Sequence, residues 1–280
     1  FTLPCNHKLN SGSAQVKSAI LLASLGAAGK TTILEKIGSR DHTEIMLKYL
    51  GAKISKKGEK ISLDSPNFLE SRNIYIPGDF SSAAFLIVAG LIISKSKITL
   101  KDVGLNYYRI GLIDVLKKMN ARINIKNKRK LNDEEIGDLE VFNSNLKGVS
   151  FTGKISPRMI DEYPIVFIAA SFASGTSVFK GLGELKVKES NRLKVMYESL
   201  KLLGVKIKMG DSHIEIEGSE NYNCNAKIKT FDDHRIAMSS LVFGMASNGS
   251  VEIDDMSMIN TSFPNFKETF EGLGAKIKFI

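Results

Sequence analysis

The sequence has no tryptophan and only two cysteines, Cys5 and Cys224, which lie far apart. They fit no metal-binding or redox spacing, so we expect free thiols in a reducing cytoplasm. No apolar stretch reaches the ~20 residues that a membrane-spanning helix needs. The longest one, residues 85–93, ends at Ser94 and Lys95. The N-terminus also lacks the features of a signal peptide, so we expect a cytoplasmic location.

Acidic residues are fewer than basic ones: 30 Asp and Glu stand against 39 Lys and Arg, a net charge of +9 in 280 residues. Such an excess suits nucleic acid, acidic surfaces or small anions. The basic run Lys126-Asn127-Lys128-Arg129-Lys130 lacks the interleaved aromatic residues of a nucleic-acid site, and acidic residues follow it. We therefore expect this run to be a loop, and we favour small anions as ligands.

Four segments of the sequence share one pattern. Each opens with a helix rich in small residues, and these helices begin near Ser13, Ser81, Asp161 and Asp233. A β-rich run follows each helix, at residues 31–33, 97–100, 177–179 and 250–253. Each unit then has a second helix with a similar ending: Leu50-Gly51-Ala52-Lys53-Ile54, Met119-Asn120-Ala121-Arg122-Ile123, Leu203-Gly204-Val205-Lys206-Ile207 and Leu273-Gly274-Ala275-Lys276-Ile277.

The second position of each ending, Gly or Asn, suits a left-handed helix C-cap, and the alternation after it predicts a pair of strands. Such units cannot bury their faces singly and must pack on one another. Of the intervals between successive helix endings, the one between Asn120 and Gly204 is the longest, and it holds a charged insertion at about residues 126–148. A polar connection at residues 65–72 separates unit one from the other three. Alone, unit one would leave Ile20, Leu21, Leu25 and Leu47 exposed or in need of another surface.

The stretch at residues 186–192 concentrates charge at the start of an expected amphipathic helix. Lys188 and Arg192 are four residues apart and would share a helix face, and Glu189 and Arg192 are three apart. Two cations and a carboxylate can hold an anion and move a proton. The alternative is a solvated cluster of ion pairs.

Other helix starts carry similar groups. Ser13 and Gln15 stand where a helix N-terminus binds phosphate, although Ser13 is also a normal N-cap, and Arg40 follows the first strand. Asp161 would cap its helix or accept a proton. Arg235 opposes the helix dipole, so a bound carboxylate explains it better. His234 alone is weak evidence, and no second His or Cys stands at metal-ligand spacing.

Seven short motifs occur in one order along nearly the whole chain: Ser13-Ala14-Gln15, Ser39-Arg40-Asp41, Pro77-Gly78-Asp79-Phe80-Ser81-Ser82-Ala83, Asp161-Glu162-Tyr163-Pro164, Lys188-Glu189-Ser190-Asn191-Arg192, Asp233-His234-Arg235 and Thr261-Ser262-Phe263-Pro264. This ordered set resembles the 5-enolpyruvylshikimate-3-phosphate synthase family. The resemblance implies an inside-out α/β barrel (α+β) of βαβαββ-type units, with the active site between two three-unit domains. Residues 1–72 would be the third unit of an N-terminal domain, and residues 73–280 a complete C-terminal domain.

The implied reaction transfers an enolpyruvyl group from phosphoenolpyruvate to the 5-hydroxyl of shikimate 3-phosphate in aromatic amino acid biosynthesis, without metal or organic cofactor. By resemblance, shikimate 3-phosphate would contact Ser13, Gln15, Arg40, Asp161 and Lys188. Phosphoenolpyruvate would contact Gln15, Glu189, Arg192, His234 and Arg235. Asp161 would accept the hydroxyl proton, and Glu189 would protonate the methylene carbon.

Two departures from the family pattern stand out. The motifs of its N-terminal third, including a Lys-Ser pair and phosphate-binding arginines, do not occur, and Thr261 stands where some members have lysine. We therefore expect an N-terminally truncated chain with weak or no activity alone, with a second polypeptide as one possible source of the missing units. Two alternatives remain: a UDP-N-acetylglucosamine enolpyruvyltransferase, and a non-catalytic fragment that binds anions.

Overall fold

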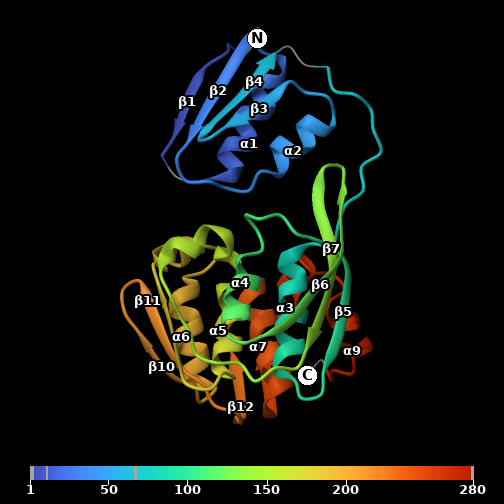
Figure 1. Ribbon diagram of the computed structural model, residues 1–280. Coiled ribbons are helices and arrows are strands. Elements are labelled where there is room, and N and C mark those ends of the chain that lie inside the picture. Colours follow the sequence, from blue (N-terminus) through green and yellow to red (C-terminus); the bar gives the residue numbers. More distant parts are fainter. Residues whose placement is uncertain (1–2, 11, 66–67, 279–280) are drawn as a thin grey trace.

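A computed structural model describes residues 3–10, 12–65 and 68–278. Its N-terminal part lies above a larger C-terminal part, and residues 68–77, which form no helix or strand, run from one toward the other (Figure 1). Ser65 to Arg72, which we expected as a polar connection, includes residues 66–67, which lie outside the described residues. No helix in the described ranges is long and apolar enough to cross a membrane.

The N-terminal part is one four-stranded sheet with two helices. Its elements are β1 (Asn6–Leu9), α1 (Ala14–Ala23), the 3-10 helix η1 (Ser24–Gly26), β2 (Gly29–Glu35), α2 (His42–Tyr49), β3 (Ile54–Lys57) and β4 (Lys60–Ser65). The strand order is β1-β2-β4-β3, with β1 parallel to β2 and the other pairs antiparallel.

The expectation that unit one exposes its apolar residues is wrong for the residues we named. Leu21 and Leu47 are each 1% exposed, and Ile20 and Leu25 pack partly against them. These side chains come from α1, η1 and α2 and pack against Ile33, Ile61 and Leu63 of the sheet. The N-terminal part therefore has a small core of its own, separate from that of the C-terminal part.

The C-terminal part contains three further units. The first has α3 (Phe80–Ile92), β5 (Lys97–Gly104), α4 (Gly111–Lys118), β6 (Arg122–Leu131) and β7 (Glu134–Phe142). The second has β8 (Ser150–Phe151), η2 (Gly153–Arg158), η3 (Ile160–Glu162), α5 (Tyr163–Ser171), β9 (Thr176–Lys180), η4 (Gly183–Val187), α6 (Arg192–Leu202), β10 (Lys206–Met209) and β11 (His213–Glu217). The third has β12 (Asn223–Ile228), α7 (His234–Ala246), β13 (Asn248–Ile253), α8 (Ser257–Asn260) and α9 (Phe266–Gly272).

The first helices of these units, α3, α5 and α7, pack together in the centre of the C-terminal part. Buried residues cover nearly all of α3 and every position of α5. A helix that is apolar all round belongs inside a protein, and here the sheets β5-β7-β6, β10-β11-β9-β8 and β12-β13 enclose the three. Their polar first turns then come together, as the contacts below show.

The repeat predicted from the sequence is confirmed for the first three units. The second position of every helix ending, Gly51, Asn120, Gly204 and Gly274, has positive φ, as a left-handed C-cap requires. The pattern did not predict the strands β1, β8 and β12, each of which precedes the first helix of its unit. Each pairs in parallel with the strand that follows that helix: β1 with β2, β8 with β9 and β12 with β13. In the fourth unit no strand follows α9 within the described residues.

The expectation of a loop for the basic run is wrong. Residues 126–130 belong to β6, which pairs antiparallel with β7 and forms a long arm that rises toward the N-terminal part (Figure 1). The basic run resembles a polar loop in the sequence because both faces of this arm are largely exposed to solvent. The strand therefore lacks the alternation of apolar and polar residues that a half-buried strand shows.

Candidate functional site

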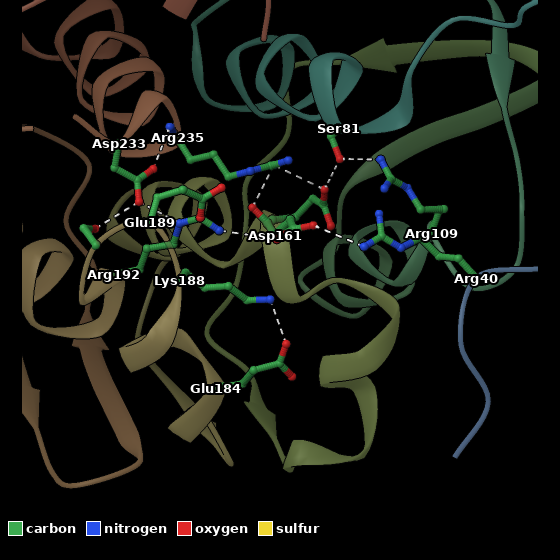
Figure 2. Close-up of polar contacts among 12 residues, drawn as sticks. Arg40, Ser81, Arg109, Asp161, Glu184, Lys188, Glu189, Arg192, Asp233 and Arg235 are labelled. Carbon is green, nitrogen blue, oxygen red and sulfur yellow. Dashed lines mark hydrogen bonds and ion pairs between the residues drawn. The ribbon is translucent and has the colours of Figure 1, made fainter. Parts of the chain in front are cut away.

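Asp161 lies where the two parts of the chain meet. It belongs to η3, just before α5, which starts with Pro164 in its first turn. Its carboxylate is 3.3 Å from Nη1 of Arg192 and 3.9 Å from Nη2 of Arg40, so it pairs with cations instead of capping the helix. Figure 2 shows Asp161 in the middle of this charged group. Burial opposes its ionisation, but Arg235, Lys188 and Arg192 together hold the pKa of Asp161 below its ordinary value.

The helix expected to contain Lys188 begins later than predicted. Residues 183–187 form the 3-10 helix η4, and α6 starts at Arg192 with Asn191 as N-cap, accepting from the Lys194 N–H at 3.1 Å. Lys188 therefore does not share a helix face with Arg192, and its ammonium pairs with Glu184 at 2.7 Å (Figure 2). Asn191 caps the helix, whereas the hydroxyl of the preceding Ser190 donates to Asp233, so the helix starts at Arg192.

Arg192 is fully buried and is surrounded by carboxylates. Its Nε donates to Asp233 at 2.8 Å, and its Nη2 lies 2.6 Å from Glu189, as the spacing predicted. Asp233 is also fully buried and accepts from the Ser190 hydroxyl at 2.9 Å and the Arg235 N–H at 3.0 Å. Although burial opposes it, the hydrogen bond from Arg192 lowers the pKa of Asp233.

The start of α7 directs a second guanidinium to the same place. Asp233 is the N-cap of α7, and Arg235 donates from Nη1 to the Asp161 carbonyl at 2.9 Å and pairs with Glu162 at 3.6 Å. From the sequence, we expect a bound carboxylate to offset the charge of Arg235 at this helix start. In the structure, the Glu162 carboxylate and the Asp161 carbonyl already lie against its guanidinium. Burial and the neighbouring Arg235 lower the pKa of His234, which keeps this imidazole neutral.

Further residues outside our predicted site join this network. Ser81 in the first turn of α3 donates to Glu162 at 2.5 Å, and Arg109 donates to Ser81 at 2.6 Å and to Asp79 at 3.0 Å. Ser81 and Glu162 lay inside quoted motifs, whereas Arg109 stands in a loop without a motif signal. Burial raises the pKa of Glu162, which is fully enclosed between these groups.

The N-terminal part contributes Arg40 to the site. We predicted three site residues in this part, Ser13, Gln15 and Arg40. In the described structure, Arg40 is the one of them that pairs with a charged group of the C-terminal part, Asp161. Ser13 is the N-cap of α1, accepting from the Val16 N–H at 3.3 Å, and Gln15 is exposed. Two further contacts join the parts beside Arg40: Asn106 donates to Asp41 at 2.8 Å, and His42 lies 2.5 Å from Glu134 at the end of the β6–β7 arm.

This arrangement is suited to holding small anions and to accepting a proton. The first turns of α3, α5 and α7 converge there, so their partial positive charges add to those of the arginines. Asp161 is an ionised acceptor in their midst. No group of three or more His, Cys, Asp or Glu residues in the described part of the chain is arranged to hold a metal ion.

The comparisons with known proteins agree with this fold and site. The family model for EPSP synthase (3-phosphoshikimate 1-carboxyvinyltransferase) matches residues 4–270. A 3-phosphoshikimate 1-carboxyvinyltransferase of Petrotoga mobilis is 44% identical over 96% of this chain and 62% of its own length. The solved EPSP synthase of Acinetobacter baumannii is 38% identical, with a TM-score of 0.93 over 99% of this chain and 64% of that one.

A more distant structure, the enolpyruvyl transferase NikO from Streptomyces tendae, shares the fold with a TM-score of 0.76 at 16% identity over 98% of this chain and 65% of that one. The fold is thus that of the inside-out α/β enolpyruvyl transferases. The chain belongs to the EPSP synthase family. It spans a little under two thirds of the length of the relatives that it matches, and these relatives carry the remaining length in the same polypeptide. They give no support to a second polypeptide.

Proposed function

We propose that this chain carries most of the active site of an enzyme that transfers the enolpyruvyl group of phosphoenolpyruvate to the 5-hydroxyl of shikimate 3-phosphate. The observation that carries the proposal is the position of Asp161, an ionised carboxylate between Arg40 of the N-terminal part and Arg192 of the C-terminal part. Such a carboxylate can accept a hydroxyl proton while the cations on either side hold two anionic substrates.

The residues divide into two groups of proposed contacts. Ser13, Gln15, Arg40 and Lys188 bind shikimate 3-phosphate together with Asp161, and Gln15 also reaches phosphoenolpyruvate. Arg192, His234 and Arg235 bind phosphoenolpyruvate together with Glu189. Glu189 is half exposed and touches Arg192 at 2.6 Å, which leaves its carboxyl group accessible for protonating the methylene carbon in the addition step. Loss of phosphate from the tetrahedral intermediate, together with a proton from its new methyl group, then restores the double bond and completes the transfer.

Residues 1–72 are proposed to be the third unit of an N-terminal domain and residues 73–280 the whole C-terminal domain, in the cytoplasm. The separate cores of the two parts support this division. Because catalysis depends on both substrates being held in register, we expect these 280 residues alone to bind anions weakly and turn over negligibly. The non-catalytic, anion-binding alternative therefore stays open for the isolated polypeptide, whereas nothing in the comparisons favours the UDP-N-acetylglucosamine reaction.

Calorimetric titration of the chain with each substrate, beside a phosphate-release assay, tests the proposal. We expect measurable binding of both shikimate 3-phosphate and phosphoenolpyruvate, and loss of phosphoenolpyruvate binding in Arg235→Ala. Binding of neither substrate, or binding that Arg235→Ala leaves unchanged, would contradict the assigned site. Substantial phosphate release by the purified chain would show that these residues suffice for catalysis.

A further inference from the structure

Lys17 is a fully buried lysine in the N-terminal part, and no role assigned so far uses it. Its ammonium lies 3.0 Å from Glu35, 2.7 Å from Glu44 and 3.3 Å from the Ser39 carbonyl. The ammonium donates hydrogen bonds to Glu35 and the Ser39 carbonyl and forms an ion pair with Glu44. Lys56 approaches Glu35 at 3.6 Å and completes a cluster of two cations and two carboxylates.

The partners of Lys17 lie on both sides of Arg40. On one side, Glu35 at the end of β2 accepts from both the N–H and the hydroxyl of Ser39, at 3.2 and 2.5 Å. On the other side, Glu44 in the first turn of α2 faces the same ammonium. A separate contact, between Ser18 and Thr43 at 2.6 Å, joins α1 to α2 beside this pair. The segment that carries Arg40 is therefore fastened to α1 before and after it.

Lys17 is also one turn below the N-terminus of α1. Its N–H donates to the Ser13 carbonyl at 3.1 Å, and Ser13 is the N-cap residue of that helix. Lys17 thus lies in the first turn of the helix whose start bears Ser13 and Gln15, and its side chain joins that turn to the segment that bears Arg40. Stability alone does not explain a buried ion pair well, because apolar residues of similar volume are often as stabilising. A requirement for one fixed geometry does.

We propose that Lys17, Glu35 and Ser39 are positioning residues that fix the distance between Arg40 and the N-terminus of α1, and so form a preorganised site for a phosphorylated ligand. The identity of that ligand, shikimate 3-phosphate, rests on the proposed function. The fixed position of the segment that carries Arg40 rests only on the contacts described above. The cluster does not touch the ligand and acts through Arg40, Ser13 and Gln15.

Lys17→Met removes the charge at nearly constant volume, and Lys30→Met is its matched control. Lys30 makes an exposed ion pair with Asp64 at 3.7 Å in the same part of the molecule. We expect Lys17→Met to weaken shikimate 3-phosphate binding about tenfold or more, since misplacement by ~1 Å can cost about 10²-fold. Phosphoenolpyruvate keeps its contacts with Arg192, His234 and Arg235 and shares only Gln15 with the affected site, so Lys17→Met should weaken its binding clearly less. Lys30→Met should weaken the binding of neither ligand.

Ser39→Ala and Ser39→Thr provide a gentler pair should Lys17→Met fail to fold. The alanine variant loses the hydroxyl donor to Glu35, whereas threonine keeps it. Hydrogen exchange of residues 38–42 in the ligand-free protein reports the segment directly. We expect exchange about tenfold faster in Ser39→Ala, as for loss of a hydrogen bond to a charged group, with recovery in Ser39→Thr.

Unchanged exchange in a folded Lys17→Met or Ser39→Ala protein would overturn the proposal, and so would equal weakening of both substrates. If the unsubstituted chain binds no shikimate 3-phosphate, the proposed function fails while the exchange rates still decide whether the cluster fixes the segment. Faster exchange confined to residues 38–42 and selective loss of shikimate 3-phosphate binding would support it.

Discussion

Within the described residues, each part of the molecule buries a cation among carboxylates, and the pKa shifts of Glu44 in one cluster and of Asp161 and Asp233 in the other run in opposite directions. Lys17 and Arg192 are both fully buried. Around Lys17, burial outweighs the attraction of the ammonium and raises the pKa of Glu44. Around Arg192, burial is outweighed, and the pKa values of Asp161 and Asp233 are lowered.

The difference follows from the number of donors that each carboxylate receives. Glu44 faces one ammonium, whereas Asp233 accepts hydrogen bonds from Arg192, Ser190 and the Arg235 N–H. A carboxylate that accepts two or three such bonds favours its charged form strongly. The Arg192 cluster therefore keeps Asp161 and Asp233 ionised, as proton acceptance by Asp161 requires. In the Lys17 cluster, burial makes the charged form of Glu44 less favourable than in solution, although Lys17 still pairs with it.

The largest effect should come from removing the cations. Arg192→Met leaves Asp233 buried without its main partner, so we expect a loss of about 3–5 kcal/mol in the free energy of unfolding of the C-terminal part. Lys17→Met should cost the N-terminal part clearly less, because Glu44 can take up a proton. Urea unfolding, with the two parts followed separately, measures both values. Equal losses would remove the distinction between the clusters.

The second test removes the charge of one acid from each cluster. Asp233→Asn should lower the free energy of unfolding by about 1.5–3 kcal/mol, since it weakens hydrogen bonds to a charged group. Glu44→Gln should cost less than about 1 kcal/mol, because burial raises the pKa of Glu44 and so makes its charged form less stabilising at this position. The same unfolding measurement at neutral pH compares the two variants. A larger loss in Glu44→Gln than in Asp233→Asn would contradict the argument from donor number.

The contrast between the clusters also shows what the sequence could predict. The site motifs at residues 161, 189, 192 and 235 stood at helix starts, and the structure brings them together because the starts of α6 and α7 meet the residues just before α5. Repetition predicted these helices and their strands. The positive φ of Asn120 confirms that even the helix ending with Asn in place of Gly is a left-handed C-cap.

What escaped prediction depended on contacts between distant segments. Lys17 looked like an ordinary helix residue because its partners, Glu35 and Glu44, are 18 and more positions away and follow no motif. Arg109 reaches Ser81 across 28 positions for the same reason. The start of α6 differs from the prediction for a local reason. The spacing of Lys188 and Arg192 is compatible with an earlier helix start, but the side chain of Asn191 caps the helix after Lys188.

A third test compares the arginines that each part supplies to the site. A planar guanidinium holds a carboxylate or phosphate through two parallel bonds, which an ammonium cannot do. We expect Arg235→Lys to weaken phosphoenolpyruvate binding about tenfold, or ~1.4 kcal/mol, with little effect on shikimate 3-phosphate. Arg40→Lys should show the reverse preference. Titration calorimetry with both ligands measures the four affinities, and parallel losses of both ligands would indicate a structural role for either arginine.

The smallest effect concerns pH and the one imidazole beside the Arg192 cluster. Burial and Arg235 lower the pKa of His234 below the ordinary 6.5, so the unfolded chain binds this proton at a higher pH than the folded protein does. Stability therefore falls as the pH drops from about 6.5 through the pKa of the folded state. Glu162 acts in the opposite direction, because its raised pKa adds stability as the pH falls toward 4.5.

Because His234 and Glu162 change the stability in opposite directions as the pH falls, the contribution of His234 is measured by comparing variants. We expect His234→Gln to lose less stability than the unsubstituted chain between pH 7 and pH 5, because glutamine takes up no proton there. His213→Gln is the matched control, since that imidazole lies on β11, away from the Arg192 cluster. Urea midpoints at each pH give the measurement. If His234→Gln and His213→Gln change the pH profile equally, the environment of the Arg192 cluster is not what keeps His234 neutral.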